Sequence, residues 1–525
     1  MLYIILFYSF TQNSFILLYN LLYNIYTASS FDNVNPVVNT TCFFLDINCT
    51  NLIKRRKINS MKDSKTLKPK TQINIKAMLA VLAFSGFLAV FNETILNVAL
   101  NILMEEMNVT AGTIQWIVTA YMMIVAVMVP VTAFLIQSFE LKKLYLGAMV
   151  ILLIGTICTA CSKTFPILLI SRMLQASGTG MMIPIMMNTI LLITPQKKRG
   201  SAMAIGACAI QLGPALGPTI SGFILQFFNW HVLFIMLIPL IILAMIFGHI
   251  YLVNVSTLTK PKIDITSIIL STIGVGGIIY SLSSLDSGNT KIVGITFIIG
   301  MITLIAFGKR QLSLKEPMLE IRTFKFPLFS IGVALVMISM MTIFTMNVML
   351  PMFLQGALKT TTFVAAMILL PATLINGFVT LIGGKIYDKL GAKILIQVGF
   401  AIMLVSLFIL SRLTLDTSLA KITIIYIVVC IGVGSTLSPS QTSSLNQLPR
   451  EYYPHGVAIL NTLQQLSAAI GSSLFIGIMS ASQQKALNNL ASEQAAVTAG
   501  FNTAVLALTV LVLFGLFLSF TLKSE

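Results

Sequence analysis

The segment that decides the fold is Leu169-Ile170-Ser171-Arg172-Met173-Leu174-Gln175-Ala176-Ser177-Gly178-Thr179-Gly180, because its end recurs later in the chain. Gly178-Thr179-Gly180 is matched by Gly432-Val433-Gly434 at an offset of 254 residues. Further matches join Gln211 to Gln465 and Gly217 to Gly471 at that offset, and Asn97-Val98-Ala99-Leu100 to Asn347-Val348-Met349-Leu350 at 250. Each match is short, but the shared offset indicates an internal repeat.

The composition places this repeat in a membrane. The chain has 525 residues, of which 57% are hydrophobic and 9% charged, whereas soluble domains carry about 25% charged residues. Apolar runs of about 20 residues predict membrane-spanning helices. Fourteen such runs centre near residues 77–100, 113–136, 144–162, 165–193, 200–226, 231–253, 266–285, 291–308, 327–355, 361–383, 392–411, 421–446, 455–482 and 501–522.

The repeat divides these fourteen spans into two halves. Span n maps onto span n+8, which gives two six-helix pseudo-repeats, spans 1–6 and 9–14, with two inserted spans between them. The fold class is therefore an all-α integral membrane protein. The predicted units are residues 77–255 for the N-terminal half, 256–326 for the inserted spans and their linker, and 327–525 for the C-terminal half. Parallel six-span repeats with a site at their interface are typical of one large class of secondary transporters.

The charges predict the orientation. If the N-terminus is cytoplasmic, loops and tails on that side hold 26 of the 33 Lys and Arg residues, and the opposite side holds six. This bias follows the positive-inside rule, so both termini are expected in the cytoplasm. The net charge of +17 then reflects topology and contact with anionic lipids, and it does not indicate a nucleic-acid partner.

Glu93 is the only acidic residue within a predicted span. A charged side chain at the bilayer centre costs about 2.5–3.5 kcal/mol on insertion scales, so such a group suggests a function, here a proton site. Burial disfavours the charged form of a carboxyl and a nearby cation favours it. The alternative is a packing role, with the carboxyl satisfied by Asn92, Thr94 or Asn97. The repeat places Ile343 or Phe344 opposite Glu93, so the acid has no counterpart.

Arg172 is the only basic residue in the interior of a predicted span, and it maps onto Tyr426 in the repeat. An unpaired guanidinium at that depth is as costly as the acid, so pairing with a carboxylate or with backbone carbonyls is expected. Because Arg172 lies near the outer start of its span, snorkelling to the outer interface is a competing interpretation. We predict a proton-coupling pair of Glu93 and Arg172.

Two further motifs predict moving parts. Gly213-Pro214-Ala215-Leu216-Gly217-Pro218 combines small residues, which permit close helix contact, with two prolines that bend the helix. It is either a packing kink or a bend about which a half opens.

The second motif, Gly384-Lys385-Ile386-Tyr387-Asp388-Lys389-Leu390-Gly391, joins spans ten and eleven. Asp388 is expected to cap the following helix and to receive basic neighbours. In its counterpart the glycine is Ala133 and the acid is Gln137.

The expected substrate cavity is apolar and rich in methionine, an adaptable residue, although the 28 methionines also suit core filling. Its expected polar points are Asn92, Asn97, Gln175, Gln211, Asn347, Asn376 and Gln465. No metal or catalytic cluster is expected, because His231, His249 and His455 lie far apart in the sequence. The C-x-x-C of Cys158 and Cys161 lies inside an apolar helix, where small packing residues are the simpler interpretation. The chain is therefore expected not to be an enzyme.

These motifs resemble those of the major facilitator superfamily, over about residues 77–522. N-E-T-I-L-N-V-A-L from Asn92, R-x-x-Q-x-x-G-x-G from Arg172 and G-P-x-x-G-P from Gly213 are similar to the fourteen-span drug:proton antiporters of the EmrB/QacA type, and to Gram-positive lincosamide exporters. The resemblance implies drug:H⁺ antiport of lipophilic or cationic compounds across the bacterial cytoplasmic membrane. It implies a proton gradient as the energy source, and neither ATP nor a cofactor. The degenerate loop around Gln137 leaves gating to the copy around Asp388.

Under this resemblance we expect Glu93 to load a proton from outside and to release it inward as the drug leaves. The expected partners are drug-like small molecules, protons and membrane lipids, and the expected state is a monomer. The alternative is a symporter, or an exporter of one specific metabolite, with the same fold; G-P-x-x-G-P favours export. A channel or a membrane receptor is disfavoured by the two-half repeat with kinked spans.

The first 76 residues differ from the rest of the chain. Residues 1–60 are predicted to be an upstream extension from a misassigned start or a disordered tail, because Met61 opens a basic segment, 61–76, that suits a cytoplasmic tail. Peptide mass mapping of the purified protein should then find Met61 or a nearby residue at the N-terminus. Abundant peptides from residues 1–50 would contradict this.

Overall fold

The computed structural model describes residues 74–255, 258, 264–283, 290–314, 317–489 and 492–522. The predictions for residues 1–60, and for most of 61–76, lie outside this part of the chain. Within it the chain is helical, and fourteen helices are long and apolar enough to cross a membrane. The all-α, fourteen-span prediction is thus confirmed.

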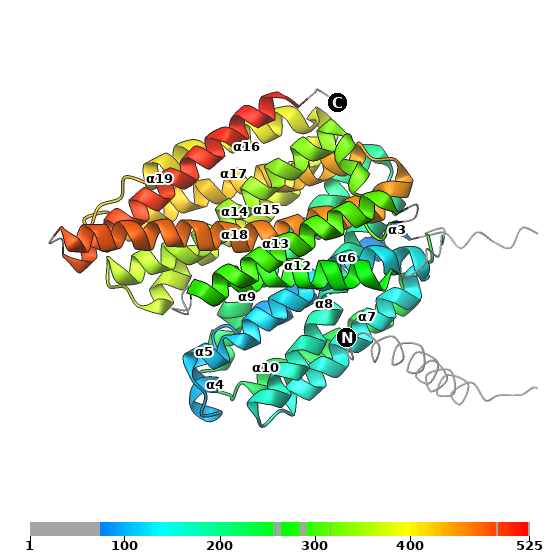
Figure 1. The fold of residues 1–525 in the computed structure, drawn as a ribbon, viewed down its shortest axis with the longest axis horizontal. Helices are drawn as coiled ribbons and strands as arrows, with labels where there is room; N and C mark the ends of the chain where they lie inside the picture. The colour runs from blue at the N-terminus through cyan, green and yellow to red at the C-terminus, as the bar shows by residue number, and fades with distance from the viewer. Residues whose placement is uncertain are drawn as a thin grey trace, which may run out of the picture. The chain divides into compact units, whose positions relative to one another are not determined.

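The N-terminal half consists of six spans and short connecting helices (Figure 1). Its elements are α3 (Ile75–Thr94), α4 (Leu100–Glu106), α5 (Ala111–Ile114), α6 (Trp116–Ser138), α7 (Leu141–Ala160), α8 (Phe165–Ile193), the 3₁₀ turn η2 (Gln196–Lys198), α9 (Arg199–Ile224), α10 (His231–Ile235) and α11 (Leu237–Tyr251). The sixth span is α10 and α11 together, with a break at Met236.

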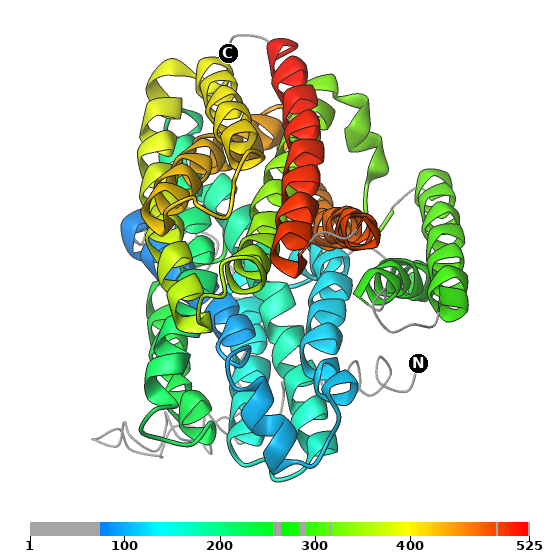
Figure 2. The same ribbon diagram turned by 90° about the vertical axis from the view of Figure 1, so that its left-hand side faces the viewer.

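Two inserted helices and the C-terminal half follow. The inserted pair is α12 (Ile265–Ser283) and α13 (Thr290–Ser313), followed by the 3₁₀ turn η4 (Ile321–Lys325). The C-terminal half contains α14 (Pro327–Gly356), α15 (Thr362–Leu390), α16 (Ala392–Leu410), α17 (Leu419–Asn446), the 3₁₀ turn η5 (Arg450–Tyr452), α18 (Tyr453–Asn488) and α19 (Glu493–Phe520). In Figure 2 the C-terminal half lies above the N-terminal half, with the inserted pair on one side.

The 254-residue repeat is visible in the backbone as well as in the sequence. The fifth span, α9, begins after Pro195 and a three-residue 3₁₀ turn. The thirteenth span, α18, begins after Pro449 and a turn of the same length. Pro195 and Pro449 are 254 residues apart, so one local signal, a proline followed by a single 3₁₀ turn, starts both helices.

The first span is shorter than its apolar run. The hydropathy pattern predicts a helix over 77–100, but α3 ends at Thr94 and residues 95–99 form turns before α4. The hydroxyl of Thr94 donates to the carbonyls of Val90 and Phe91 at 3.2 and 3.3 Å. This break leaves Glu93 in the last turn of α3.

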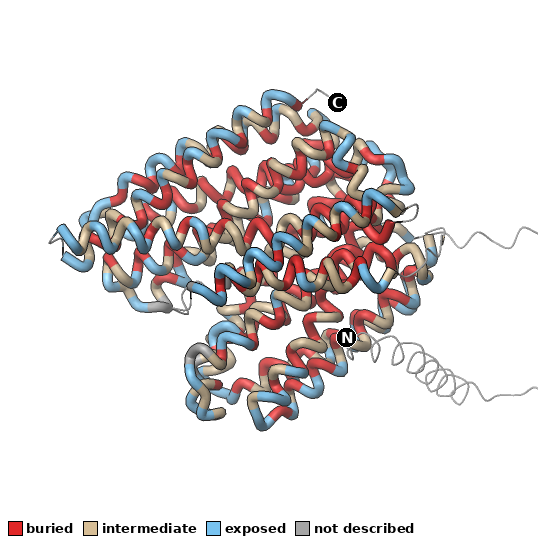
Figure 3. Tube along the Cα trace, viewed as in Figure 1, coloured by how far each residue is buried: buried red, intermediate tan, exposed pale blue. Residues whose placement is uncertain are grey.

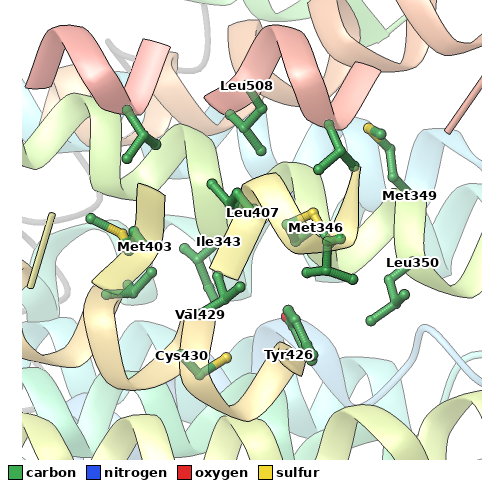
Figure 4. Close-up of a cluster of buried hydrophobic side chains, with 14 of the residues drawn as sticks. Ile343, Met346, Met349, Leu350, Met403, Leu407, Tyr426, Val429, Cys430 and Leu508 are labelled. Carbon is green, nitrogen blue, oxygen red and sulfur yellow. The ribbon is translucent and has the colours of Figure 1, made fainter. Parts of the chain in front are cut away.

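The core is aliphatic and methionine-rich, and the buried residues gather toward the interior of the bundle (Figure 3). Figure 4 shows part of the core of the C-terminal half, where Met346, Met349 and Met403 pack with Leu407 and Leu508. These methionines are fully buried in this core. Their position favours the core-filling interpretation over a substrate-facing one.

The inserted pair forms a hairpin held by a polar clamp at one end. Asp264 accepts from Arg310 Nε and Nη2 at 2.8 and 2.9 Å, and the side chain of Gln311 donates to Ser267. Arg310 holds the pKa of the Asp264 carboxyl at about 2, below its usual 3.8. The clamp closes the hairpin where α12 begins and α13 ends.

Asp264→Asn should therefore destabilise the hairpin at neutral pH. A lowered folded-state pKa gives stability that is complete above the unfolded-state value and is lost as pH falls through the folded-state value. The melting temperature of Asp264→Asn in detergent should fall below that of the parent at pH 7, and the gap should close between about pH 3.8 and 2. The effect should be about 1 kcal/mol or less, because Arg310 is 38% exposed. Lys309→Gln is the control, and a gap that does not depend on pH would contradict this assignment.

Candidate functional site

The centre of the candidate site is the buried guanidinium of Arg172 on α8, which is 1% exposed. Its Nη1 donates to the Asn92 carbonyl at 3.0 Å and to Gln175 Oε1 at 2.8 Å, and its Nη2 donates to the Glu93 carbonyl at 3.1 Å. Of the alternatives from the sequence, pairing with backbone carbonyls is the one observed. Snorkelling of Arg172 is wrong, because the side chain reaches inward to α3.

The two carbonyls that Arg172 contacts are free because α3 ends there. The last carbonyls of a helix have no intrahelical partner and need another donor. In the described chain the N–H of Ile95 bonds to Phe91 and that of Asn97 bonds to Thr94, so the carbonyls of Asn92 and Glu93 receive no turn hydrogen bond. A cation at a helix C-terminus is also favoured by the helix dipole. Arg172 thus acts as a C-cap supplied by another helix.

A shell of polar and aromatic side chains holds the guanidinium in place. Tyr121 of α6 lies beneath it, with 4.2 Å from the guanidinium carbon to the ring centre. The Tyr121 hydroxyl is 2.6 Å from the Thr179 hydroxyl and accepts from Asn92 Nδ2 at 3.3 Å. Gln175 donates to the Thr156 hydroxyl at 3.1 Å. Helices α3, α6, α7 and α8 therefore meet at one polar cluster.

Glu93 lies beside this cluster but takes no hydrogen bond from it. Its side chain is partly buried, and within the described residues its carboxylate has neither a hydrogen bond nor an ion pair, including with Arg172. The packing interpretation is wrong on this point. Asn92 donates to Tyr121 and the Thr94 hydroxyl donates to backbone carbonyls, so neither satisfies Glu93.

The glycine–proline motif packs against the end of α3. Pro214 and Pro218 lie inside α9, and Gly213 approaches so closely that a Cβ there would be 2.9 Å from the backbone N of Phe91. A Cβ on Gly217 would clash with the Thr94 hydroxyl, which itself donates to the Gly213 carbonyl at 3.3 Å. Both glycines are required for this approach, and α9 is thereby coupled to the helix that carries Glu93.

The C-terminal half has a neutral contact at the equivalent place. Tyr426, the counterpart of Arg172, donates to Asn347 Oδ1 at 2.8 Å, and Asn347 is the counterpart of Asn97. Asn97 itself is exposed in the turn after α3. In this half α14 runs unbroken past Asn347 to Gly356.

The other predicted cavity residues lie apart from the Arg172 cluster. Gln211 on α9 accepts from Thr380 on α15 at 3.4 Å, which joins the two halves. Asn376 is 2% exposed and lies one turn from Thr380. Within the described chain, Gln211 Nε2 and Asn376 Oδ1 are buried without a hydrogen-bond partner. Gln465 on α18 is partly buried.

Asp388 caps a different helix from the one expected. Its carboxylate accepts from the backbone N–H of Gly200 at 2.8 Å and of Ser201 at 2.9 Å, and from the Ser201 hydroxyl. It therefore caps α9 of the opposite half, whereas α16 begins at Ala392, after Gly391, without a side-chain cap. The prediction that Asp388 caps the following helix is wrong, because the start of α9 lies within its reach.

The rest of the loop motif supports this contact. A Cβ on Gly384 would clash with Ala204 and with the Gly200 carbonyl, so α15 and α9 cross at two glycines. Gly391 has φ +77°, which favours glycine, and it turns the chain between α15 and α16. Lys389 is exposed.

We call the end of the bundle where α8 leads into α9 and α15 into α16 the basic end, since it carries Lys197, Lys198 and Lys389. Arg199 is buried there and donates from Nη1 to Asn446 Oδ1 at 2.8 Å and to the Tyr453 hydroxyl at 2.7 Å. Gln137 Nε2 lies 3.4 Å from His455 Nε2. These contacts all join one half to the other, so the halves are closed together at the basic end.

Sequence reasoning missed Tyr121, Thr179, Arg199 and Tyr453. Tyr121 and Thr179 are ordinary residues within apolar runs, and no local pattern marks them as partners of Arg172. Arg199 follows Lys197 and Lys198 and looks like one more loop cation. Its repeat position was the available signal, because Arg199 and Tyr453 are 254 residues apart.

Comparison with known proteins places this geometry in a family. The model of the Major Facilitator Superfamily matches residues 82–472. The lincomycin resistance protein LmrB of Bacillus subtilis is 40% identical over 468 residues, which cover 87% of this chain and 98% of that protein. LmrB of Listeria monocytogenes is 40% identical over 453 residues, 85% of this chain and 96% of that protein.

A solved structure shares the fold at much lower identity. The human organic anion transporter MFSD10 superposes with a TM-score of 0.62 at 11% identity, over 85% of this chain and 100% of that chain. At this identity the likeness concerns the fold alone. The fold and the family match agree on a membrane transporter built of two helical halves.

Arg172→Lys should disable the site although it keeps the charge. A lysine ammonium is a compact point charge and lacks the planar fork that reaches two carbonyls and Gln175 together. Each lost hydrogen bond to a charged group costs about 1.5–3 kcal/mol. Transport should fall at least tenfold, by about 1.4 kcal/mol or more, and the melting temperature should drop. Arg412→Lys, at an exposed position, is the control. Near-normal transport in Arg172→Lys would contradict the capping role.

Proposed function

The chain belongs to the Major Facilitator Superfamily, and on this premise we propose that it exports lipophilic or cationic drugs in exchange for protons. The proposal is supported by relatives named for lincomycin resistance, which match at 40% identity over nearly their whole length. The observation that carries the exchange mechanism is the carboxylate of Glu93, partly buried and unpaired beside the capped break of α3.

We place the protein in the bacterial cytoplasmic membrane with both termini in the cytoplasm. The positive-inside bias supports this orientation, and it assigns the basic end to the cytoplasmic side. The contacts of Asp388 and Arg199 then close the transporter on its cytoplasmic side. The proton gradient supplies the energy, and no ATP or cofactor is required.

Glu93 is the proton carrier in this proposal. It lies at the end of α3, where the helix has already given way to turns. Because Arg172 is bonded to the carbonyls of Asn92 and Glu93 and not to the Glu93 carboxylate, the acid can gain or lose a proton without breaking the cap. Arg172 is a positioning residue: it fixes the backbone of the acid and supplies a constant positive charge nearby.

The cycle couples this acid to the two halves through α9. A proton reaches Glu93 from the outside while the basic end is closed. Neutralising the acid removes the cost of enclosing a charge, so the halves close over it and the contacts of Asp388 and Arg199 give way. Drug binding from the cytoplasm and proton release inward then reset the transporter. Helix α9 connects the acid to the basic end. Gly213 and Gly217 pack on α3, which carries Glu93, and the Gly200 N–H donates to Asp388.

One proton is sufficient to drive useful export. Moving one charge across 100 mV is worth about 2.3 kcal/mol. A tenfold concentration ratio requires about 1.4 kcal/mol, so for an uncharged drug one proton supports an accumulation of more than tenfold even without a pH difference. Exchange for a monovalent cationic drug moves no net charge and depends on the pH difference instead. The drug pathway would use the polar points that the two halves present to each other, Gln211 and Asn376 among them.

Glu93→Gln should abolish drug export and leave expression intact. Glutamine keeps the shape and hydrogen-bonding capacity of the acid but cannot release a proton in this way. Cells that produce the variant should be as susceptible to lincomycin as cells without the protein. Glu105→Gln makes the same chemical change at an exposed position on α4 and should retain export.

The direction of transport and its coupling require a second measurement. Drug uptake into inside-out vesicles should be driven by an imposed proton gradient and abolished by a protonophore. A symporter would instead show uptake in right-side-out vesicles when the gradient points inward. Full resistance in Glu93→Gln, or export that is insensitive to the protonophore, would refute the proposal.

A further inference from the structure

The two halves meet along two seams that are built differently. Along the first, α9 packs directly on α15. Gly200 and Gly384 let the backbones cross in contact, and Gly377 faces Cys208 and Leu212. Asp388 adds charge-assisted bonds to the start of α9. This α9–α15 seam is tight from the basic end to the level of Gln211.

Along the second seam, α6 faces α18 with less extensive packing. At the basic end Gln137 Nε2 of α6 lies 3.4 Å from His455 Nε2 of α18, at the limit of hydrogen-bonding distance. Gln137 occupies the repeat position of Asp388, so a carboxylate contact on one seam corresponds to an amide contact on the other. The α6–α18 seam is also the less extensively packed of the two.

The inserted helix α12 lies over the α6–α18 seam. A single apolar cluster combines Ala126 of α6, Val275, Ile278 and Ile279 of α12, and Leu466 of α18. In Figure 2 the green helix α12 lies beside both the blue α6 and the orange α18. Within the described chain, α12 packs on α6, α18 and α13, while α13 packs on α12 and η4.

Two contacts near the end opposite the basic end attach α12 to both halves. The Trp116 ring of α6 stacks on Tyr280 with centroids 5.5 Å apart. Ser473 of α18 donates to the Leu282 carbonyl at 3.1 Å. Among the described residues, the other contacts of α12 with the two halves, those of the apolar cluster, include no hydrogen bond or ring stacking. Van der Waals packing of this kind can slide as the halves move, because no hydrogen bond has to break.

We propose that α12 is a lateral seal, which keeps lipid out of the α6–α18 seam as this seam parts during the cycle. The location of the charged site makes a seal necessary. Tyr121 of α6 contacts Arg172, while Ala126, just over one turn further along the same helix, contacts α12. One helix therefore separates the bilayer side from the polar cluster, and polar groups exposed to lipid cost several kcal/mol each.

The test measures the accessibility of Leu466→Cys from the bilayer. Leu466 is 8% exposed and lies in the cluster beneath α12. The variant is made with Cys158→Ser and Cys161→Ser, and the parent without the added cysteine gives the background. In membrane vesicles with an imposed proton gradient, a bilayer-soluble alkylmaleimide should label Leu466→Cys no faster than this background.

Trimming the seal should expose the same cysteine. Ile278→Ala with Ile279→Ala removes side chains that are 4% and 3% exposed against the seam, and it should raise the labelling of Leu466→Cys several-fold. Ile298→Ala with Ile302→Ala removes the same atoms from α13, where those side chains are 58% and 60% exposed. This matched variant should leave the labelling unchanged.

Two outcomes would overturn the proposal. One is rapid labelling of Leu466→Cys in the intact protein, and the other is equal labelling after trimming α12 or α13.

A second cysteine serves as the folding control. Met403→Cys, buried in the core of the C-terminal half, reports misfolding and should stay unlabelled. If it reacts when Ile278→Ala and Ile279→Ala are combined, Ile279→Ala alone is used. The seal rests on the proposed transport cycle, but its readout requires no drug export. Failure of Glu93→Gln to abolish export would therefore refute proton coupling and leave the labelling result valid.

Discussion

The structure depends on a helix end that lies in the interior of a bilayer protein. A helix that stops there leaves carbonyls that water cannot reach, and each unsatisfied group would cost several kcal/mol. Arg172 removes this cost by donating to the carbonyls of Asn92 and Glu93. The break in α3 and the buried guanidinium stabilise each other. Unpaired carbonyls at the helix end, or an unpaired guanidinium inside the protein, would each cost free energy. Tyr121, Thr179 and Gln175 then hold the guanidinium in position.

The same fold uses chemistry of opposite character in its two halves. At the positions equivalent to Arg172 and Asn97, the C-terminal half has Tyr426 and Asn347, joined by one neutral hydrogen bond beneath an unbroken α14. Its core is a continuous aliphatic and methionine cluster. The N-terminal half is thus charged and interrupted where the C-terminal half is neutral and continuous. The inserted α12 then packs against one helix of each half.

The features that depend on one helix alone could be predicted from the sequence. Those that depend on contacts between two helices could not. Fourteen apolar runs and a shared offset are enough for the architecture, since hydropathy and periodicity are local properties. Glu93 and Arg172 were identified because charge inside an apolar run is rare. The partner of Asp388 was not, because its carboxylate reaches α9 in the other half, 188 residues away in the chain. Tyr121 and Tyr453 carry no local mark, and only the folded arrangement brings them to an arginine.

The contact between Arg199 and Tyr453 bears on how the duplicated chain arose. The two residues occupy equivalent positions of the repeat, and they meet each other across the halves, so the pseudo-twofold axis passes close to this contact. In a symmetric dimer of identical halves, each residue at such a point faces a copy of itself. An arginine would then oppose an arginine, and a tyrosine would lose its cationic donor. The present pairing therefore became possible only once the two halves had diverged at this position.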